Sequence, residues 1–140
     1  MQLFSHDDKA TALGNAPLFK NLSRGELVEL AKVTEDMEVG DGRVLAREGE
    51  IGREFFVIVD GDVLVTKGGE EVNRLGAGDF FGEIALIWES PRRTASVAAA
   101  GPVRFFVLTR QSFRSLIGHH PDIEEKVLGA IEERVGTAEA

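Results

Sequence analysis

The sequence of 140 residues contains no cysteine. Disulfide bonds, thiolate zinc sites and cysteine nucleophiles are therefore excluded, and the absence fits a reducing cytoplasm, where we expect the protein to act. Long apolar runs are also missing, since none approaches the roughly 20 residues that a membrane-spanning helix requires. The sequence thus predicts no membrane partner. Composition leaves open whether the chain is a complete protein or one domain of a longer one.

Positive charge is in deficit. Lys and Arg number 16 against 24 Asp and Glu, which gives a formal net charge of −8. This sign is wrong for a protein whose main partner is the nucleic-acid backbone, so we expect no direct nucleic-acid contact. The length and a hydrophobic content of 43% predict one globular domain over residues 1–140.

The distribution of glycine divides the chain into three zones. Eleven of the 16 glycines lie between Gly40 and Gly101. A glycine-rich middle between glycine-poor flanks predicts short strands with tight turns, framed by helices. We expect N-terminal helices over residues 1–35, a small barrel, roll or sandwich over 36–109, and C-terminal helices over 110–140.

Within the middle zone, residues 55–59 and 62–66 are strand-like and are separated by a predicted turn at 60–61. Residues 94–100 and 103–109 form a second pair of predicted strands, parted by Gly101 and Pro102. Turns that recur at about 8–12 residues fit a mainly β architecture.

The flanking zones carry helix signals. Ser23 and Glu26 have the spacing of a capping box, and Pro121 suits the first position of a later helix. That later helix has an apolar stripe, formed by Ile123, Val127, Leu128, Ile131 and Val135. The stripe fits packing on the β zone, and it also fits a lid or a dimer helix.

The stretch 79–97 contains the candidate ligand-binding residues. Gly82 allows a sharp turn out of a strand, and residues 83–86 have room for about one helical turn, whose first N–H groups lack intrahelical partners and attract anions. Arg93 adds a planar fork of donors that matches two phosphate oxygens. Glu83 is an acceptor beside this anion site, so a suitable ligand presents a donor as well. A sugar hydroxyl next to a phosphate meets both demands.

This stretch resembles the phosphate-binding cassette of cyclic nucleotide-binding domains: aromatic-Gly-Glu, a small apolar turn, a variable loop, then Pro-Arg, small residues and Val. Other short motifs typical of the family precede the cassette, in the same order as in the family, at residues 48–50, 56–58, 61–63 and 75–79. The resemblance covers the chain from about Pro17 to about Val135, with the cassette at 81–97. It implies a mainly β fold with flanking helices, a double-stranded β-helix of the β-roll or jelly-roll type.

The resemblance also implies roles for the polar groups of the cassette. Glu83 would accept a hydrogen bond from the ribose 2′-hydroxyl. Ile84 and Ala85 would offer backbone N–H groups to the cyclic phosphate. Arg93 would pair with the exocyclic phosphate oxygens, and Thr94 would place a hydroxyl near the phosphate or the purine.

The remaining expected ligand contacts are apolar or backbone. Gly82 would let the backbone approach the sugar, while Val65, Leu75 and Phe81 would wall the base and the ribose. Trp88, in the variable loop, could stack on a purine or serve packing.

The assignment of the phosphate arginine involves a choice between neighbours. The gap from Glu83 to Arg93 is one residue longer than in the commonest eukaryotic pattern, and the shorter count selects Arg92. Counting back from residues 95–97 selects Arg93. We favour Arg93 because the following strand fixes the geometry, whereas the loop can absorb an insertion.

The function predicted from these features is a non-enzymatic sensor that binds a cyclic nucleotide and signals through its C-terminal helices. The expected ligand is cAMP, with cGMP as the alternative, and the sequence predicts neither catalytic residues nor a metal site. A second interpretation is a ligand-free β-roll that acts as a protein-interaction or regulatory scaffold. A homodimer and an effector domain or protein both remain open as partners.

A metal-dependent enzyme on a similar β-roll is the least favoured alternative. Such sites need several histidines on strands, but His6, His119 and His120 all lie outside the predicted strand zone. The adjacent pair His119 and His120 does not place both rings on one helix face, so we expect it to mark a helix end.

Overall fold

The structure is a computed structural model that describes residues 5–86 and 92–139, apart from the side chains of residues 83, 84, 131 and 133–139. The chain forms two compact units. The helical unit comprises Met1–Thr34 and Gln111–Ala140, and the β unit comprises Glu35–Arg110. That the whole chain acts as one domain stays a prediction.

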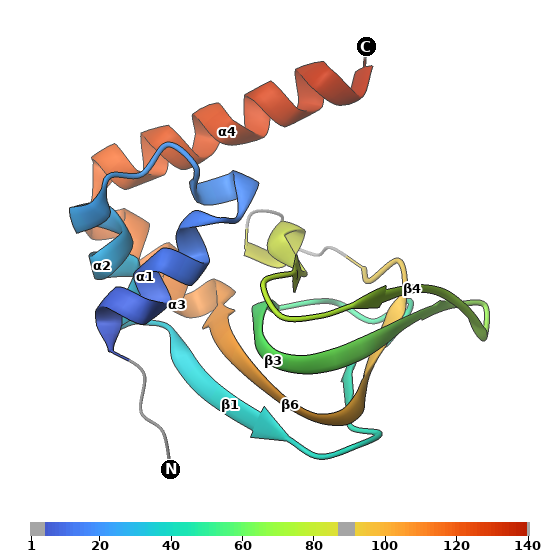
Figure 1. Cartoon of the computed structure of the whole chain (residues 1–140). Helices are drawn as coiled ribbons and strands as arrows, with labels where there is room; N and C mark the ends of the chain where they lie inside the picture. The colour runs from blue at the N-terminus through green and yellow to red at the C-terminus, as the bar shows by residue number, and fades with distance from the viewer. Residues whose placement is uncertain (1–4, 87–91, 140) are drawn as a thin grey trace. The chain divides into compact units, whose positions relative to one another are not determined.

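The β unit is a six-stranded antiparallel sheet. Its strands are β1 (Glu35–Val39), β2 (Val44–Ala46), β3 (Glu54–Lys67), β4 (Glu70–Leu75), β5 (Phe80–Phe81) and β6 (Ser96–Thr109). Strands β1, β6, β3 and β4 are neighbours in that order (Figure 1), while β2 pairs with β6 and β5 with β3. A mainly β unit between helical segments is therefore confirmed.

The two longest strands correct the sequence prediction. β3 and β6 are each a single strand of 14 residues, so the turns predicted at 60–61 and 101–102 are wrong. The two positions at which turns were predicted lie opposite one another in the sheet, because Asp60 pairs with Arg104 and Asp62 with Ala100. The register shifts between these pairs, and such irregularities bend a strand while the ladder continues on either side.

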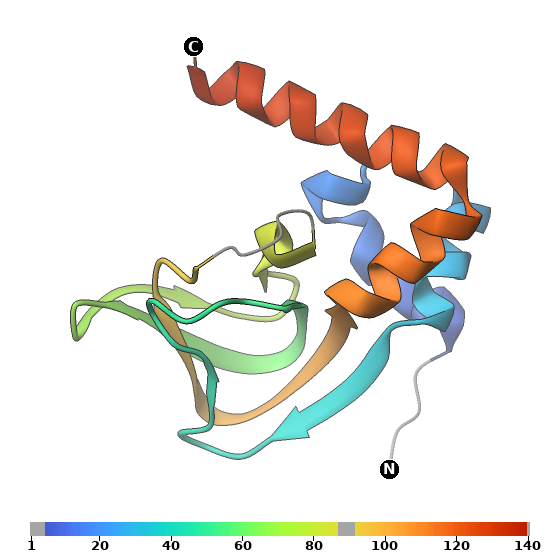
Figure 2. The ribbon, with the colours of Figure 1, turned by 180° about the vertical axis from the view of Figure 1, so that it is seen from behind.

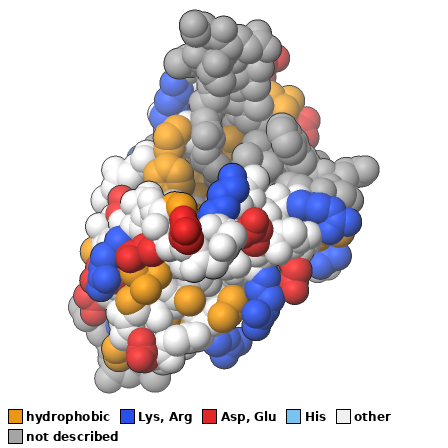
Figure 3. All heavy atoms as spheres, turned by 90° about the vertical axis from the view of Figure 1, so that its right-hand side faces the viewer, with side chains coloured by type: hydrophobic (Ala, Val, Ile, Leu, Met, Phe, Trp, Pro, Cys, Tyr) orange, Lys and Arg blue, Asp and Glu red, His pale blue; other side chains and the backbone are white. Residues whose placement is uncertain are grey.

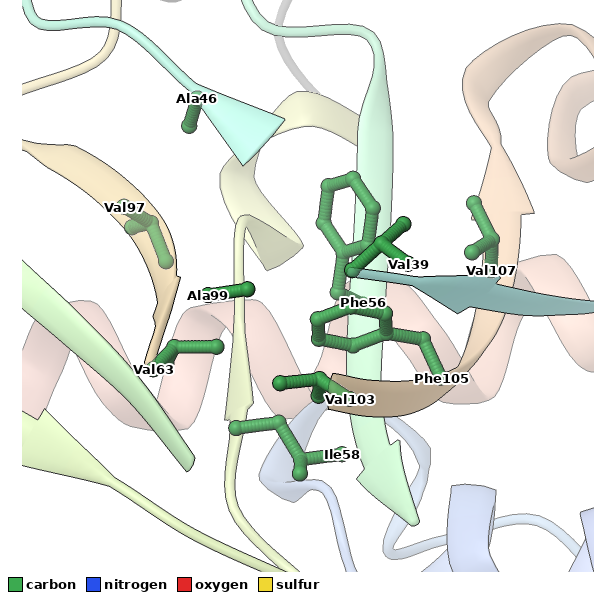
Figure 4. Packing of buried hydrophobic residues seen from close by; sticks show 10 residues of the cluster. All are labelled: Val39, Ala46, Phe56, Ile58, Val63, Val97, Ala99, Val103, Phe105 and Val107. Carbon is green, nitrogen blue, oxygen red and sulfur yellow. The ribbon is translucent and has the colours of Figure 1, made fainter. Parts of the chain in front are cut away.

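The core of the β unit is built from inward-facing residues of four strands. The buried cluster consists of Val39, Ala46, Phe56, Ile58, Val63, Val97, Ala99, Val103, Phe105 and Val107 (Figure 4). Phe56 stacks on the ring of Phe81, with centroids 4.6 Å apart, and meets Phe105 edge-on at 5.5 Å. The apolar interior thereby fixes the position of β5, directly before the predicted cassette turn.

The helical unit contains α1 (His6–Gly14), the 3₁₀ segment η1 (Pro17–Phe19), α2 (Arg24–Lys32), α4 (Pro121–Glu139) and α3 (Arg110–His119) except for its first residue, which belongs to the β unit. Within this unit α4 packs against η1 (Figure 2). Ile123 and Val127 are buried as expected, whereas Leu128 is 49% exposed, so the apolar stripe is not wholly covered. In the described part of the chain, no helix has both the length and the apolar character that a membrane crossing needs.

The capping box predicted at Ser23 is confirmed, and its glutamate has a second task. The Glu26 N–H donates to Ser23 Oγ at 3.2 Å, and the Ser23 N–H donates to Glu26 Oε1 at 2.8 Å. Lys126 Nζ on α4 donates to the same Oε1 at 2.6 Å. The hydrogen bond from Lys126, followed by that from the Ser23 backbone, lowers the pKa of Glu26. Glu26 therefore links α4 to α2.

We expect Glu26→Gln to destabilise the helical unit by up to about 1 kcal/mol at pH 7, because glutamine still caps the helix but cannot pair with Lys126. A carboxylate with a lowered pKa stabilises the fold above its unfolded pKa of about 4.3, and this contribution is lost as pH falls through the folded pKa. The difference between parent and variant should thus shrink towards zero near pH 3.

Urea unfolding at several pH values measures this difference. Glu29→Gln is the matched control, because the salt bridge of Glu29 is formed with Lys32 of the same helix at 2.9 Å, whereas Glu26 pairs with a lysine of α4. A Glu26→Gln penalty that is independent of pH would contradict the proposed ion pair.

Candidate ligand-binding site

The β unit contains a pocket of about 400 Å³, a size suited to a small-molecule ligand. Its wall is shared by strands, the β5 end and the segment before β6: Ala46, Gly52, Val65, Asn73, Leu75, Phe80, Phe81, Gly82, Ala85, Arg92, Arg93, Thr94, Ala95 and Val97. The structure therefore brings together seven of the nine residues predicted from sequence, namely Val65, Leu75, Phe81, Gly82, Ala85, Arg93 and Thr94.

One wall of the pocket is a row of paired residues across four strands. Asn73 of β4 pairs with Val65 of β3, Val65 pairs with Val97 of β6, and Val97 pairs with Ala46 of β2. Paired residues place their side chains on the same face of a sheet. This row is apolar except for Asn73, so it can cover the flat face of a ring.

The polar end of the pocket is dominated by Arg93. Its side chain is half-buried, and Nη2 donates to the backbone oxygen of Glu54 at 3.0 Å. Its backbone is fixed as well, since the Arg93 N–H donates to Glu50 O at 2.7 Å and Arg93 O accepts from the Gly49 N–H at 2.8 Å. The segment before β6 is thus paired with the loop before β3, which holds the guanidinium at the pocket wall.

Two glycines make room for this guanidinium. A Cβ on Gly52 would lie 2.5 Å from Arg93 Cζ, and a Cβ on Gly82 would lie 2.5 Å from Nη1. Gly82 also has a φ of +85°, which other residues rarely adopt. We call this arrangement the glycine cradle: Gly52 and Gly82 with the Arg93 side chain between them.

The charge of Arg93 lacks a carboxylate partner among the described side chains, because none of them forms an ion pair with it. Burial lowers the pKa of Arg93, and the nearby charge of Glu54 opposes this shift. An arginine pKa is so high that the group stays cationic at neutral pH. A half-buried cation at a pocket wall that forms no ion pair with the described side chains is a strong attractor for an anion.

The predicted single helical turn after Gly82 is present as the 3₁₀ segment η2 (Glu83–Leu86). The side chains of Glu83 and Ile84 lie outside the described part, as does Trp88. The Ala85 N–H donates to Gly82 O at 3.0 Å. A phosphate would therefore have to share this N–H or replace the internal acceptor.

The two candidate arginines differ in their surroundings. Arg92 is exposed, and its Nη1 donates to Gly49 O at 2.7 Å. Arg93 is the more buried of the two and lies in the glycine cradle. Both line the pocket.

Sequence reasoning missed two informative lining residues, Gly52 and Asn73. Asn73 could have been found from strand alternation, because it lies two residues before Leu75 on the same face. Gly52 could not, because its contact with Arg93 joins segments 41 positions apart in the sequence.

Charges of both signs are interspersed with hydrophobic side chains on the face shown in Figure 3. This pattern differs from the basic stripe typical of nucleic-acid binders. Among the described residues, no group of three or more His, Asp or Glu side chains is placed to hold a metal ion. His119 Nδ1 instead lies 2.9 Å from Ser115 O, one turn earlier on α3.

Comparison with known proteins identifies the family. Residues 36–120 match the model of the cyclic nucleotide-binding domain. The chain belongs to the cyclic nucleotide-binding domain family. The family predicted from the cassette is thereby confirmed, and the pocket found here lies within the matched segment.

Two curated relatives and one solved structure show how such domains occur in larger proteins. The chain is 40% identical to a cAMP-dependent protein kinase regulatory subunit of Mycosarcoma maydis over 81% of its own length and 23% of the relative. It is 39% identical to a cyclic nucleotide-gated potassium channel of Rhizobium etli, over 86% of this chain and 33% of the channel. The regulatory domain of Toxoplasma gondii PKA, solved with cAMP, superposes with a TM-score of 0.72 at 28% identity, over 94% of this chain and 50% of that one.

These matches confirm the β-roll fold of a cyclic nucleotide-binding regulatory domain. The chain spans a third or less of the curated relatives it matches.

Proposed function

We propose that the pocket binds a cyclic nucleotide and that Arg93 pairs with its phosphate. The observation that carries this proposal is the half-buried guanidinium of Arg93, which lines the pocket and forms no ion pair with any described side chain, although the charge of Glu54 is nearby. A cyclic phosphate supplies one negative charge and two exocyclic oxygens, which match the two-pronged donor edge of arginine. The pocket of about 400 Å³ has room for such a ligand.

The other ligand contacts follow from the walls of the pocket. Val65, Leu75 and Phe81 cover the base and the ribose, and Thr94 places a hydroxyl at the phosphate end. Gly82 lets the backbone approach the sugar. These five residues all line the pocket.

The cassette turn completes the proposed site. The carboxylate of Glu83 accepts from the ribose 2′-hydroxyl, while the N–H groups of Ile84 and Ala85 face the phosphate. Ala85 does so by sharing its N–H with Gly82 O, since an amide can serve two acceptors at a helix end.

The ligand that we favour is cAMP. The Mycosarcoma maydis relative is named for its dependence on cAMP, and the Toxoplasma gondii structure contains it. Calorimetry of the purified chain against cAMP, cGMP and AMP tests this choice. We expect heat with cAMP, less with cGMP, and least with AMP, whose phosphate is not tied back to the ribose. Absence of heat with both cyclic nucleotides would instead favour a ligand-free regulatory scaffold.

We also propose that ligand binding changes the packing of the C-terminal helices, so that the domain acts as a non-catalytic regulatory switch in the cytoplasm. The support is the packing of α4 within the helical unit, where, among the described side chains, the partly exposed Lys126–Glu26 pair and three buried residues, Ile123, Val127 and Ala130, hold it. Elements held by few contacts are the ones that move in switches. Hydrogen exchange of α4 amides with and without cAMP tests this role, and equal protection in both states would exclude it.

A further inference from the structure

Arg110 connects two backbone segments that surround the proposed phosphate site. It follows Thr109, the last residue of β6. Its Nε donates to Ala85 O at 2.9 Å, and its Nη2 donates to Gly52 O at 2.7 Å. The Arg110 backbone N–H also donates to Arg53 O at 2.9 Å. The residue is thus tied at three points to the segments on either side of the pocket.

Both carbonyls that Arg110 binds belong to residues of the site. Ala85 lies in η2, the turn that follows Gly82, and Gly52 is the other half of the glycine cradle. One edge of a single guanidinium therefore spans the distance between the two sides of the cradle. The guanidinium is planar and rigid, so this distance is set by its geometry.

We propose that Arg110 is a positioning residue that holds the glycine cradle closed around Arg93. The effect of Arg110 on ligand affinity rests on the proposed function. Its effect on the orientation of Arg93 concerns the ligand-free protein and does not depend on that function. Lysine keeps the charge at this position, but its single ammonium group cannot present two fixed donors on one edge. When one carbonyl loses its donor, Gly52 and Ala85 are free to shift relative to each other, and Arg93 loses its fixed orientation.

The first test is made without ligand, on protein labelled with ¹⁵N in arginine. In Arg110→Lys, the Nε–H signal of Arg93, assigned from its loss in Arg93→Ala, should broaden or exchange with water several-fold faster than in the parent. The control is Arg43→Lys, because Arg43 is exposed on the turn between β1 and β2. An Arg93 signal unchanged in Arg110→Lys, with the fold intact, overturns the proposal whether or not the protein binds a nucleotide.

The second test measures cAMP affinity by calorimetry at a temperature where circular dichroism shows both proteins to be folded. Arg110→Lys should weaken binding roughly five- to thirtyfold, the equivalent of one or two kcal/mol. In an Arg93→Ala background the same change should have a clearly smaller further effect, because Arg110 acts mainly through Arg93 and otherwise only through the position of Ala85. Equal losses in both backgrounds would show that Arg110 supports the fold only, which contradicts the proposal. Failure of the parent to bind would refute the proposed function alone, since the ligand-free test still decides the role of Arg110.

Discussion

Arg93→Ala is expected to lower the affinity for cAMP about ten- to a hundredfold. A hydrogen bond to a charged group contributes about 1.5–3 kcal/mol, and 1.4 kcal/mol corresponds to a factor of ten. The fold should persist, because the variant removes a half-buried charge whose side-chain hydrogen bond within the described part of the chain is to one backbone oxygen, that of Glu54. Calorimetry measures the affinity, and thermal unfolding of the ligand-free protein measures the stability.

Arg92→Ala is the matched control for this experiment. Arg92 is the adjacent arginine, carries the same charge and also hydrogen-bonds a backbone carbonyl, that of Gly49. Because it is exposed, solvent screens its charge, and we expect a loss of only a few-fold. A larger loss for Arg92→Ala than for Arg93→Ala would reverse the assignment of the phosphate arginine.

The second large effect is expected from the glycine cradle. Gly52→Ala adds a Cβ that would lie 2.5 Å from Arg93 Cζ and 2.9 Å from Cδ. The alanine has no backbone strain, since Gly52 is not among the glycines with positive φ. The added atom therefore acts on the guanidinium, which must leave the cradle. Affinity for cAMP should fall by about tenfold or more, approaching the loss in Arg93→Ala.

A double-mutant cycle separates this mechanism from general damage. If Gly52→Ala acts by displacing Arg93, it should change affinity little when Arg93 is already alanine, because the clash is gone. Gly25→Ala is a useful control: Gly25 is a glycine of α2 where an added Cβ meets no atom within 4 Å. Additive losses in the cycle would mean that Gly52 affects binding by another route.

Much of the site was predictable because its signal is local in sequence. Gly82, the following turn and Arg93 lie within twelve residues. Gly82 has the positive φ that favours glycine, the turn is a short helical segment, and Arg93 is a cation with two parallel N–H donors. The capping box of Ser23 and Glu26 was found for the same reason. Local patterns of this kind depend on backbone geometry that the neighbouring residues alone determine.

The parts that were missed depend on contacts between distant segments. The residues at 60–61 and 101–102 have the composition of turns, yet each lies inside a 14-residue strand because the two breaks face each other across the ladder. Gly52 was missed because nothing near it indicates that a side chain 41 positions later packs against its Cα. Contacts between distant segments determine both the continuous strands and the packing at Gly52. The propensities of neighbouring residues carry no information about such contacts.

The most direct test of the central claim is a crystal structure of the chain grown with cAMP. The account predicts the nucleotide in the pocket lined by Val65, Leu75 and Phe81, with its phosphate oxygens within hydrogen-bond distance of the Arg93 guanidinium. A nucleotide bound elsewhere, or in the pocket with its phosphate turned away from Arg93, would contradict it.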